Sequence, residues 1–233
     1  MNASAHRAKA RAVLRGNWAT AVLAAFVVGL LSGDGTALNI VISPNKMPPV
    51  QFTVPWQLEE LLDDALGLPP QAVFGVSLVM LLAGLLLGGV MQLGSARYNL
   101  SLIDGREAKL RDVFSGIPRF SEALVMHLIR RTLETIGYVL LLVPGMVLRY
   151  GFLLAPFILT EDPACTGREA LRRSWEMMRG HKREMMWLEL SFLGWTLLAS
   201  IYYTFGVVKL FLTPYRNAAH ASFYRELSPK PDA

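Results

Sequence analysis

Cysteine is nearly absent from this chain, and charged residues are few. Because Cys165 is the single cysteine among 233 residues, the chain forms no internal disulfide and no zinc site built from several cysteines. Metal-ligand spacing is also missing from the four histidines, His6, His127, His181 and His220. The sequence contains no HExxH, P-loop or GxSxG motif. We therefore expect no enzymatic activity, no metal and no cofactor.

Hydrophobic residues are abundant instead, at 53% of the chain against 18% charged residues. A typical soluble domain is about 45–50% apolar and about 25% charged, and the excess here falls in long runs. The 23 basic residues outnumber the 18 acidic ones and flank these runs, which favours membrane anchoring over nucleic-acid binding. We predict an all-α polytopic bundle of about six membrane helices, with residues 1–233 forming one integral membrane domain.

The amino-terminal part of the chain alternates in charge. Residues 1–17 carry four basic residues and no acid, which predicts a cytoplasmic amino terminus. The apolar residues 18–31 then belong to a membrane helix that starts near Val13, or alternatively to a cleaved signal peptide. Residues 33–71 hold five acids and one lysine, so we expect an extracytoplasmic acidic loop that contains a short amphipathic helix over residues 55–70.

Residues 72–94 are 23 consecutive residues without a charge, which strongly indicates a membrane helix. Gly84 and Gly88 form a GxxxG pattern that lets helices approach closely, either within the chain or in a homo-oligomer. The segment of residues 95–120 that follows is rich in basic residues, which is typical of the cytoplasmic side. Within it, Asp104-Gly105 has the pattern of a turn. An apolar stripe then predicts a short interfacial helix through Leu110, Val113, Phe114 and Ile117.

Residues 121–160 are apolar over a length too great for one crossing of a bilayer about 30 Å thick. Two interpretations remain: a helical hairpin that turns at Pro144-Gly145, or a single crossing kinked at Pro144. Six basic residues follow within residues 164–183, and the hairpin places them in the cytoplasm. Because cytoplasmic segments are enriched in Lys and Arg, we favour the hairpin.

Five polar residues interrupt this apolar stretch. Arg130 and Arg131 lie about 13–15 Å along the first arm of the predicted hairpin, and Glu134 is within one helical turn of both. One interpretation is an intramembrane polar pocket or path. The other is an interfacial helix whose arginines reach lipid headgroups. The candidate cluster is His127, Arg130, Arg131, Glu134 and Arg149.

Residues 164–183 have the pattern of a basic amphipathic helix. Thr166 and Glu169 have the spacing of a capping box. One face is apolar, and the other presents the candidate contacts for anionic lipid headgroups or a partner protein, Arg168, Arg172, Arg173 and Arg179. A helix packed on the bundle with a solvated outer face fits the same pattern.

Two further membrane helices are expected over residues 184–206 and 207–227, followed by a polar tail at residues 228–233. In the second of them, a small-residue packing face comprises Ala218, Ala219, Ala221 and Ser222. The topology then leaves both termini in the cytoplasm of a multi-pass protein of the plasma membrane.

Five segments in this order resemble an uncharacterised bacterial integral-membrane family, the domain of unknown function 975: RAKARAVLRGNWATAVL, PGMVLRYGFLLAPFILTEDP, EALRRSWEMMRGHK, LSFLGW and TPYRNAAHASFYREL. The Pro-Gly step and the following ALxxSW helix are also similar to the membrane domain of some glycerophosphodiester phosphodiesterases. The long acidic residues 33–71 and the TEDP sequence depart from the family pattern. The resemblance implies a multi-pass plasma-membrane protein and supplies no activity.

Three functions are compatible with the sequence. We favour a non-enzymatic membrane protein that organises lipid or a partner protein through its basic cytoplasmic helix. The alternatives are a transporter or channel for a small or lipid-like anion, and a membrane enzyme or enzyme subunit.

Overall fold

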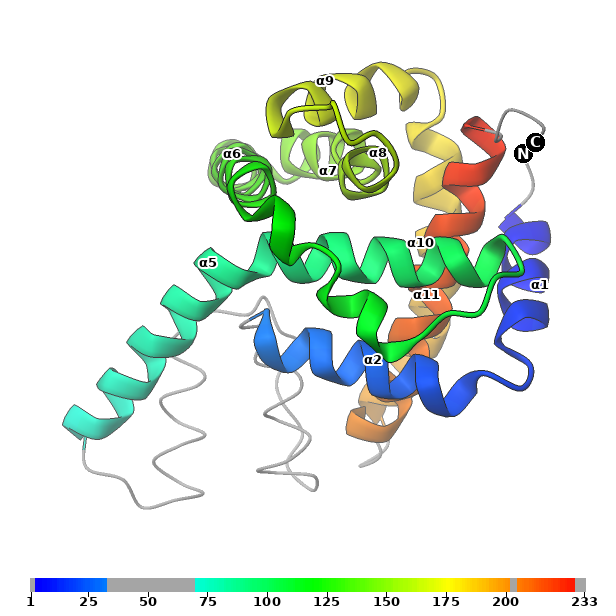
Figure 1. The fold of residues 1–233 in the computed structure, drawn as a ribbon, viewed down its shortest axis with the longest axis horizontal. Helices are drawn as coiled ribbons and strands as arrows, with labels where there is room; N and C mark the ends of the chain where they lie inside the picture. Colours follow the sequence, from blue (N-terminus) through cyan, green and yellow to red (C-terminus); the bar gives the residue numbers. More distant parts are fainter. Residues whose placement is uncertain (1–2, 33–69, 202–204, 229–233) are drawn as a thin grey trace.

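The computed structural model describes residues 3–32, 70–201 and 205–228, and within these ranges every regular element is a helix. The all-α prediction is therefore confirmed. The predicted acidic loop and its amphipathic helix lie outside the described residues, as does nearly all of the polar tail. Figure 1 shows how the helices are arranged: α1 Ala3–Leu14, α2 Trp18–Leu31, α5 Pro70–Ile103, η1 Leu110–Phe114, η2 Ile117–Arg119, α6 Phe120–Leu140, α7 Leu142–Gly151, α8 Ala155–Glu161, α9 Gly167–Met177, α10 Lys182–Ile201 and α11 Phe205–Leu227.

The predicted helix from Val13 is wrong, because the chain breaks between α1 and α2. Gly16 has φ +85°, a conformation that glycine adopts without steric penalty, and the two helices meet at 105°. The 14 residues of α2 extend about 21 Å, which is less than the thickness of a bilayer. The amino-terminal basic segment is itself helical and packs on α11.

Helix α5 is longer than the predicted membrane segment and forms the central axis of the fold. Its 34 residues extend about 51 Å, and the predicted turn at Asp104-Gly105 is confirmed by φ +69° at Gly105. Three glycines on α5 let other segments approach closely. A methyl group on Gly94 would overlap the carbonyl oxygen of Val113 in η1, and Gly88 and Gly89 lie against α6.

The apolar stripe after this turn is divided between two short 3₁₀ helices, η1 and η2, rather than one α helix. Val113 is fully buried beneath α5, whereas Phe114 and Ile117 are exposed. Pro118 at the start of η2 lacks an amide hydrogen, so it cannot extend the hydrogen-bond ladder of a continuous helix. The apolar residues of this stripe therefore lie partly in the core and partly on the surface.

Helices α6 and α7 pack against each other as a hairpin, but the chain does not turn at Pro144-Gly145. The helical run breaks at Leu141, whose backbone is extended (φ −164°, ψ 153°). Pro144 lies in the first turn of α7, where a missing amide hydrogen has no structural cost, and Gly145 packs against Tyr138 of α6. The Pro-Gly pair thus shapes the inner face of the hairpin instead of its tip.

The first and last helices of the chain are side by side. His6 of α1 is hydrogen-bonded to Ser222 of α11 (Nδ1 to Oγ, 3.1 Å), and the hydroxyl of Tyr215 donates to the carbonyl of Arg7. The predicted small-residue face of α11 is confirmed, because Ala218, Ala219, Ala221 and Ser222 are all buried. Helix α11 therefore closes the bundle against both α1 and α5.

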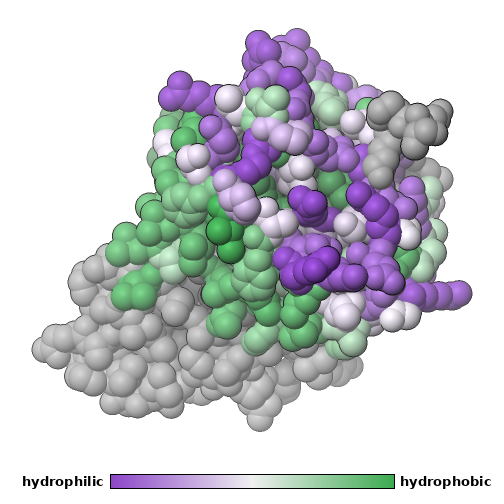
Figure 2. All heavy atoms as spheres, in the orientation of Figure 1, coloured by the Kyte–Doolittle hydropathy of each residue, from purple (hydrophilic) through white to green (hydrophobic). Residues whose placement is uncertain are grey.

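The surface is divided by polarity (Figure 2). Apolar side chains gather over the outer half of α5, and charged side chains cover the top and right of the view. The tip of the hairpin is apolar and strongly exposed, with 60–81% of each residue accessible from Val139 to Val143. Exposed apolar surface of this extent marks contact with a membrane or another protein.

Among the described residues, one stretch, Leu142–Glu161, is long and apolar enough to cross a membrane, and half of it is buried inside the protein. Helices α1 and α2 meet the same criteria only as a bent pair.

Candidate functional site

Helix α9 is held on the bundle by its cap and its inner face. The hydroxyl of Thr166 accepts a hydrogen bond from the amide of Glu169 (3.3 Å), so the predicted N-cap is confirmed. The Glu169 side chain does not complete the capping box and binds Arg173 instead. Ser174 is fully buried and joins α9 to the hairpin, because its hydroxyl donates to the carbonyl of Gly151 and accepts from the amide of Leu154.

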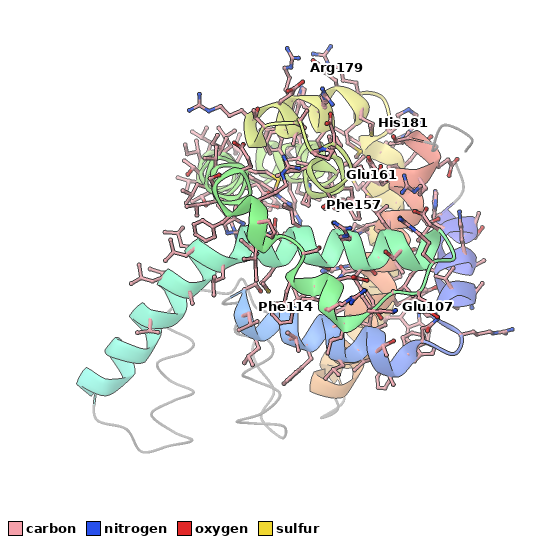
Figure 3. The ribbon with its side chains drawn as sticks, in the orientation of Figure 1. Glu107, Phe114, Phe157, Glu161, Arg179 and His181 are labelled. Carbon is pink, nitrogen blue, oxygen red and sulfur yellow. The ribbon has the colours of Figure 1, made fainter. Side chains whose placement is uncertain are left out.

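This packing settles which face of α9 is available. Its apolar side chains are turned toward α6 and α8, so they are not free to enter a membrane interface. Three of the four predicted contact arginines, Arg168, Arg172 and Arg179, are exposed on the outer face, and Arg179 lies at the outer edge of the molecule (Figure 3). The site is therefore a rigid helix that presents cations to the surroundings.

The fourth predicted contact residue, Arg173, has a structural position instead. Its guanidinium donates to Asp162 (2.7 Å) and to Glu169 (2.6 Å), which ties α9 to the end of α8. The hydrogen bond from Arg173 holds the pKa of the Asp162 carboxyl below its usual value. Arg173 is therefore engaged within the protein and is less available to a ligand than its three neighbours.

Two further arginines secure the same end of the molecule, and sequence analysis singled out neither. Arg119 donates to the backbone carbonyls of Leu159, Asp162 and Cys165, and so satisfies the orphan acceptors at the end of α8. Arg225 of α11 bonds both Asp104, at the end of α5, and Glu161 of α8, which is labelled in Figure 3. The sequence shows only that each arginine lies near the end of a helix. It does not show which groups the arginine binds, because those groups are distant in sequence.

Four members of the predicted intramembrane cluster lie along α6, and the fifth, Arg149, lies on α7. His127 is buried between α5 and α6, where its ring lies 2.9 Å from a methyl group built on Gly88. Arg130 and Glu134 form an ion pair along α6 (2.7 Å), whereas Arg131 is exposed. The packing of His127 on Gly88 favours the interpretation of the GxxxG pattern as a contact within the chain.

The fifth member of that cluster, Arg149, belongs to a different group of charges. It is close to Tyr138 and lies in electrostatic range of Glu189 on α10. Glu189 is hydrogen-bonded to His220 and lies 3.8 Å from Arg216, both on α11. Glu189 is distant in sequence from Arg216 and His220, and only the packing of α10 on α11 brings them together.

The described part of the chain contains no group of three or more His, Cys, Asp or Glu side chains placed to hold a metal ion. What the described charges can do is bind anions. Arginine presents five donors in a planar fork that suits carboxylates and phosphates.

Comparison with known proteins identifies the carboxyl-terminal part of the chain. No curated protein and no solved structure matches it. Residues 132–230 match the model of a family described as protein of unknown function, DUF975. The match covers the second half of α6 through α11 and leaves α1, α2 and α5 outside. The segment from residue 132 to residue 230 therefore belongs to the DUF975 family, as its sequence resemblance implies.

Proposed function

We propose that this protein is a multi-pass protein of the plasma membrane without enzymatic activity, whose cytoplasmic basic helix α9 binds an acidic surface of a partner protein. The observation that supports this function is the division of the surface. Exposed apolar residues cover the hairpin tip and α5 from Val79 to Leu87, while the outer face of α9 and the turn that follows it carry the exposed residues Arg168, Arg172 and Arg179. One surface suits lipid and the other suits an anionic ligand.

The lengths of the helices support a hairpin that enters the bilayer from the cytoplasmic side. Helix α7 extends about 15 Å, half the thickness of the hydrocarbon core, before the chain continues into the buried helix α8. In this arrangement Arg131 lies near the headgroups, which favours the interfacial interpretation of α6. The other proposed crossings are the outer half of α5, α10 and α11.

An acidic protein fits α9 better than a headgroup does. An amphipathic helix binds the membrane interface through its apolar face, and that face of α9 is occupied by α6 and α8. Binding by the arginines alone is electrostatic, so it is expected to weaken as salt increases. Arg130 is already paired with Glu134, which leaves the alternative of an anion path through Arg130 and Arg131 with less support.

Topology is tested with introduced cysteines, because the native Cys165 is buried. Glu107 is 86% exposed on the polar side, and Val139 is 81% exposed at the hairpin tip. With a membrane-impermeant maleimide, E107C is expected to react only after cell lysis, and V139C to remain unlabelled in intact and in lysed cells. Labelling of E107C in intact cells contradicts the proposed topology.

Binding is tested with a photo-crosslinking amino acid in place of Glu176, an exposed residue on α9, in cells. A protein adduct is expected that is lost in R168Q/R172Q/R179Q and retained in R168K/R172K/R179K. The same amino acid at Glu107 serves as the control position. An adduct with lipid alone assigns α9 to headgroups instead, and an adduct that survives the triple glutamine substitution refutes the role of the arginines.

A further inference from the structure

A small polar pocket lies between α2, α5 and α11, apart from the outer face of α9. Its polar lining comes from Ser95 and Asn99 on α5 and from Asn217 on α11. Buried alanines of α2, among them Ala21 and Ala24, leave space beside these groups because their side chains are single methyl groups. The pocket has room for about one water molecule, and the residues that line it are uncharged.

Helix α5 contributes one acceptor and one donor to the pocket that have no partner in the described part of the protein. Asn99 is 5% exposed, and its amide nitrogen donates to the carbonyl of Ser95 (2.7 Å) and approaches the Ser95 hydroxyl oxygen (3.4 Å). No described residue donates to Oδ1 of Asn99, and the Ser95 hydroxyl donates to no described acceptor. Both groups therefore have hydrogen-bonding capacity left for a ligand.

Helix α11 contributes an amide whose side chain is hydrogen-bonded to none of the described residues, that of Asn217. An amide side chain both donates and accepts hydrogen bonds. Asn217 is half-buried beside the pocket, so bulk water reaches it only in part. A polar group removed from water is unfavourable unless it gains a hydrogen bond. A ligand that both donates and accepts satisfies Asn217 and Asn99 together.

The helix that carries Asn217 has an interrupted hydrogen-bond pattern at the same place. Pro214 is buried within α11, lines the pocket and lies about one helical turn before Asn217. Because proline lacks an amide hydrogen, it cannot donate to the carbonyl of Leu210, as a regular α helix requires. In a helix that crosses a membrane, ordered water is one means of satisfying the groups that a proline leaves unpaired. Pro214 therefore adds a second reason for water in this pocket.

We propose that one ordered water molecule binds in this pocket and bridges Asn99 of α5 to Asn217 of α11. The water donates to Oδ1 of Asn99, shares a hydrogen bond with the Asn217 amide and accepts one from the Ser95 hydroxyl. About three partners of this kind are typical of a buried water. Since α5 lies outside the residues that match DUF975 and α11 lies within them, the water joins these two parts of the chain.

The test uses nuclear magnetic resonance on the full-length protein in detergent micelles, with asparagine labelled in nitrogen. Overhauser effects between water and the asparagine side-chain amide protons are measured in the laboratory and rotating frames at mildly acidic pH. A water that remains bound while the protein tumbles gives effects of opposite sign in the two frames, whereas a brief contact gives the same sign. We expect opposite signs at Asn217 and the same sign at Asn17, an exposed asparagine at the start of α2 that serves as the internal control. The variants N217S and N17S assign the two signals.

Two variants then test the bridge. N99L removes the acceptor on α5 with a side chain of similar size, and it is expected to abolish the bound-water signal at Asn217. A24V adds two methyl groups to the pocket from α2 without changing a hydrogen-bonding group, and it is expected to displace the water even if N99L fails to fold. N17L, outside the pocket, is the matched control and is expected to keep the signal. Effects of the same sign at Asn217 in the wild type, or a bound-water signal that persists in A24V, overturn the proposal.

Discussion

The two halves of α5 are both apolar, yet their surroundings are opposite. From Gly88 to Ile103 nearly every residue is buried under α2, α6, η1, α8 and α11, whereas the valine and leucine residues from Val79 to Leu87 are 36–60% exposed. Composition therefore distinguishes a core from a lipid-facing surface less well than packing does. The boundary falls at Gly88, where the side chain of His127 comes into contact with α5.

The arginines show a parallel contrast at the polar end. Arg119, Arg173 and Arg225 each join separate elements, whereas Arg168, Arg172 and Arg179 are exposed on α9 and in the turn that follows it. The first group stabilises the end of the bundle, and the second is available to a ligand. Four substitutions test these contrasts, in order of decreasing effect.

The largest effect is expected where α5 is packed most closely. In G94A the added methyl group overlaps the carbonyl oxygen of Val113, and the backbone of η1 has to move. Overpacking of this kind costs about 3 kcal/mol or more, so we expect a marked loss of monodisperse protein and a lower thermal midpoint in detergent. G194A is the matched control, because a methyl group there meets no atom within 4 Å. Equal stability of the two variants contradicts the close packing.

The hairpin tip tests the other half of the comparison. Leu141 is 68% exposed, so L141D is expected to be nearly neutral for folding in detergent. In a bilayer the same charge costs about 3 kcal/mol, and we expect more of the protein to be extracted from membranes by alkaline carbonate. A8D, at an exposed position of α1, is the control at the polar end. If the two variants are extracted equally, the tip is not in lipid.

Loss of the ion pairs of Arg225 at the polar end is expected to have an intermediate effect on stability. In R225Q the Asp104 carboxylate, which is 8% exposed, loses its buried partner. We expect a loss of about 2 kcal/mol, because Arg225 is itself 8% exposed and its removal takes away charged hydrogen bonds to two carboxylates, those of Asp104 and Glu161. R106Q removes an arginine that binds the same carboxylate but is 59% exposed, so its effect is expected to be less than about 0.5 kcal/mol. Thermal unfolding in detergent distinguishes the two; a reversed order contradicts the assignment.

The smallest effect is a pH dependence at the junction of α8 and α9. Arg173 lowers the pKa of Asp162 in the folded protein below the value near 3.8 of an unperturbed aspartate. The unfolded chain then binds the proton more readily, so the interaction stabilises the fold above about pH 4 and is lost as the pH falls through the lowered pKa. The thermal midpoint of D162N is expected to lie slightly below that of the wild type at pH 6 and to approach it at pH 3. The exposed substitution E107Q is the control, and a difference that grows at low pH contradicts the sign.

The sequence predicts structure correctly where the interacting residues are close together along the chain. The cap at Thr166, the turn at Asp104-Gly105 and the small-residue face of α11 each depend on neighbouring residues, and each is confirmed. The predicted helix from Val13 is wrong because Gly16, between Arg15 and Asn17, adopts a positive φ. Glycine permits this conformation without requiring it.

Long-range pairs could not be predicted in the same way. The cluster on α6 was inferred from spacing along one helix, but His127 faces α5 and Arg149 faces α10. Glu189 and His220 are 31 residues apart, and Arg225 and Asp104 are 121 residues apart. Which charges meet depends on how the helices pack, and periodicity within a single segment does not determine that.

The contact between α1 and α11 has a consequence for how the protein is made. His6 and Ser222 are separated by 216 positions, so α1 leaves the ribosome long before its packing partner exists. At about 5–20 residues per second, translation of the intervening chain takes roughly 10–40 s. During that interval the face of α1 that α11 later covers is open to chaperones and to wrong partners, and the bundle is completed only when the last helix is released.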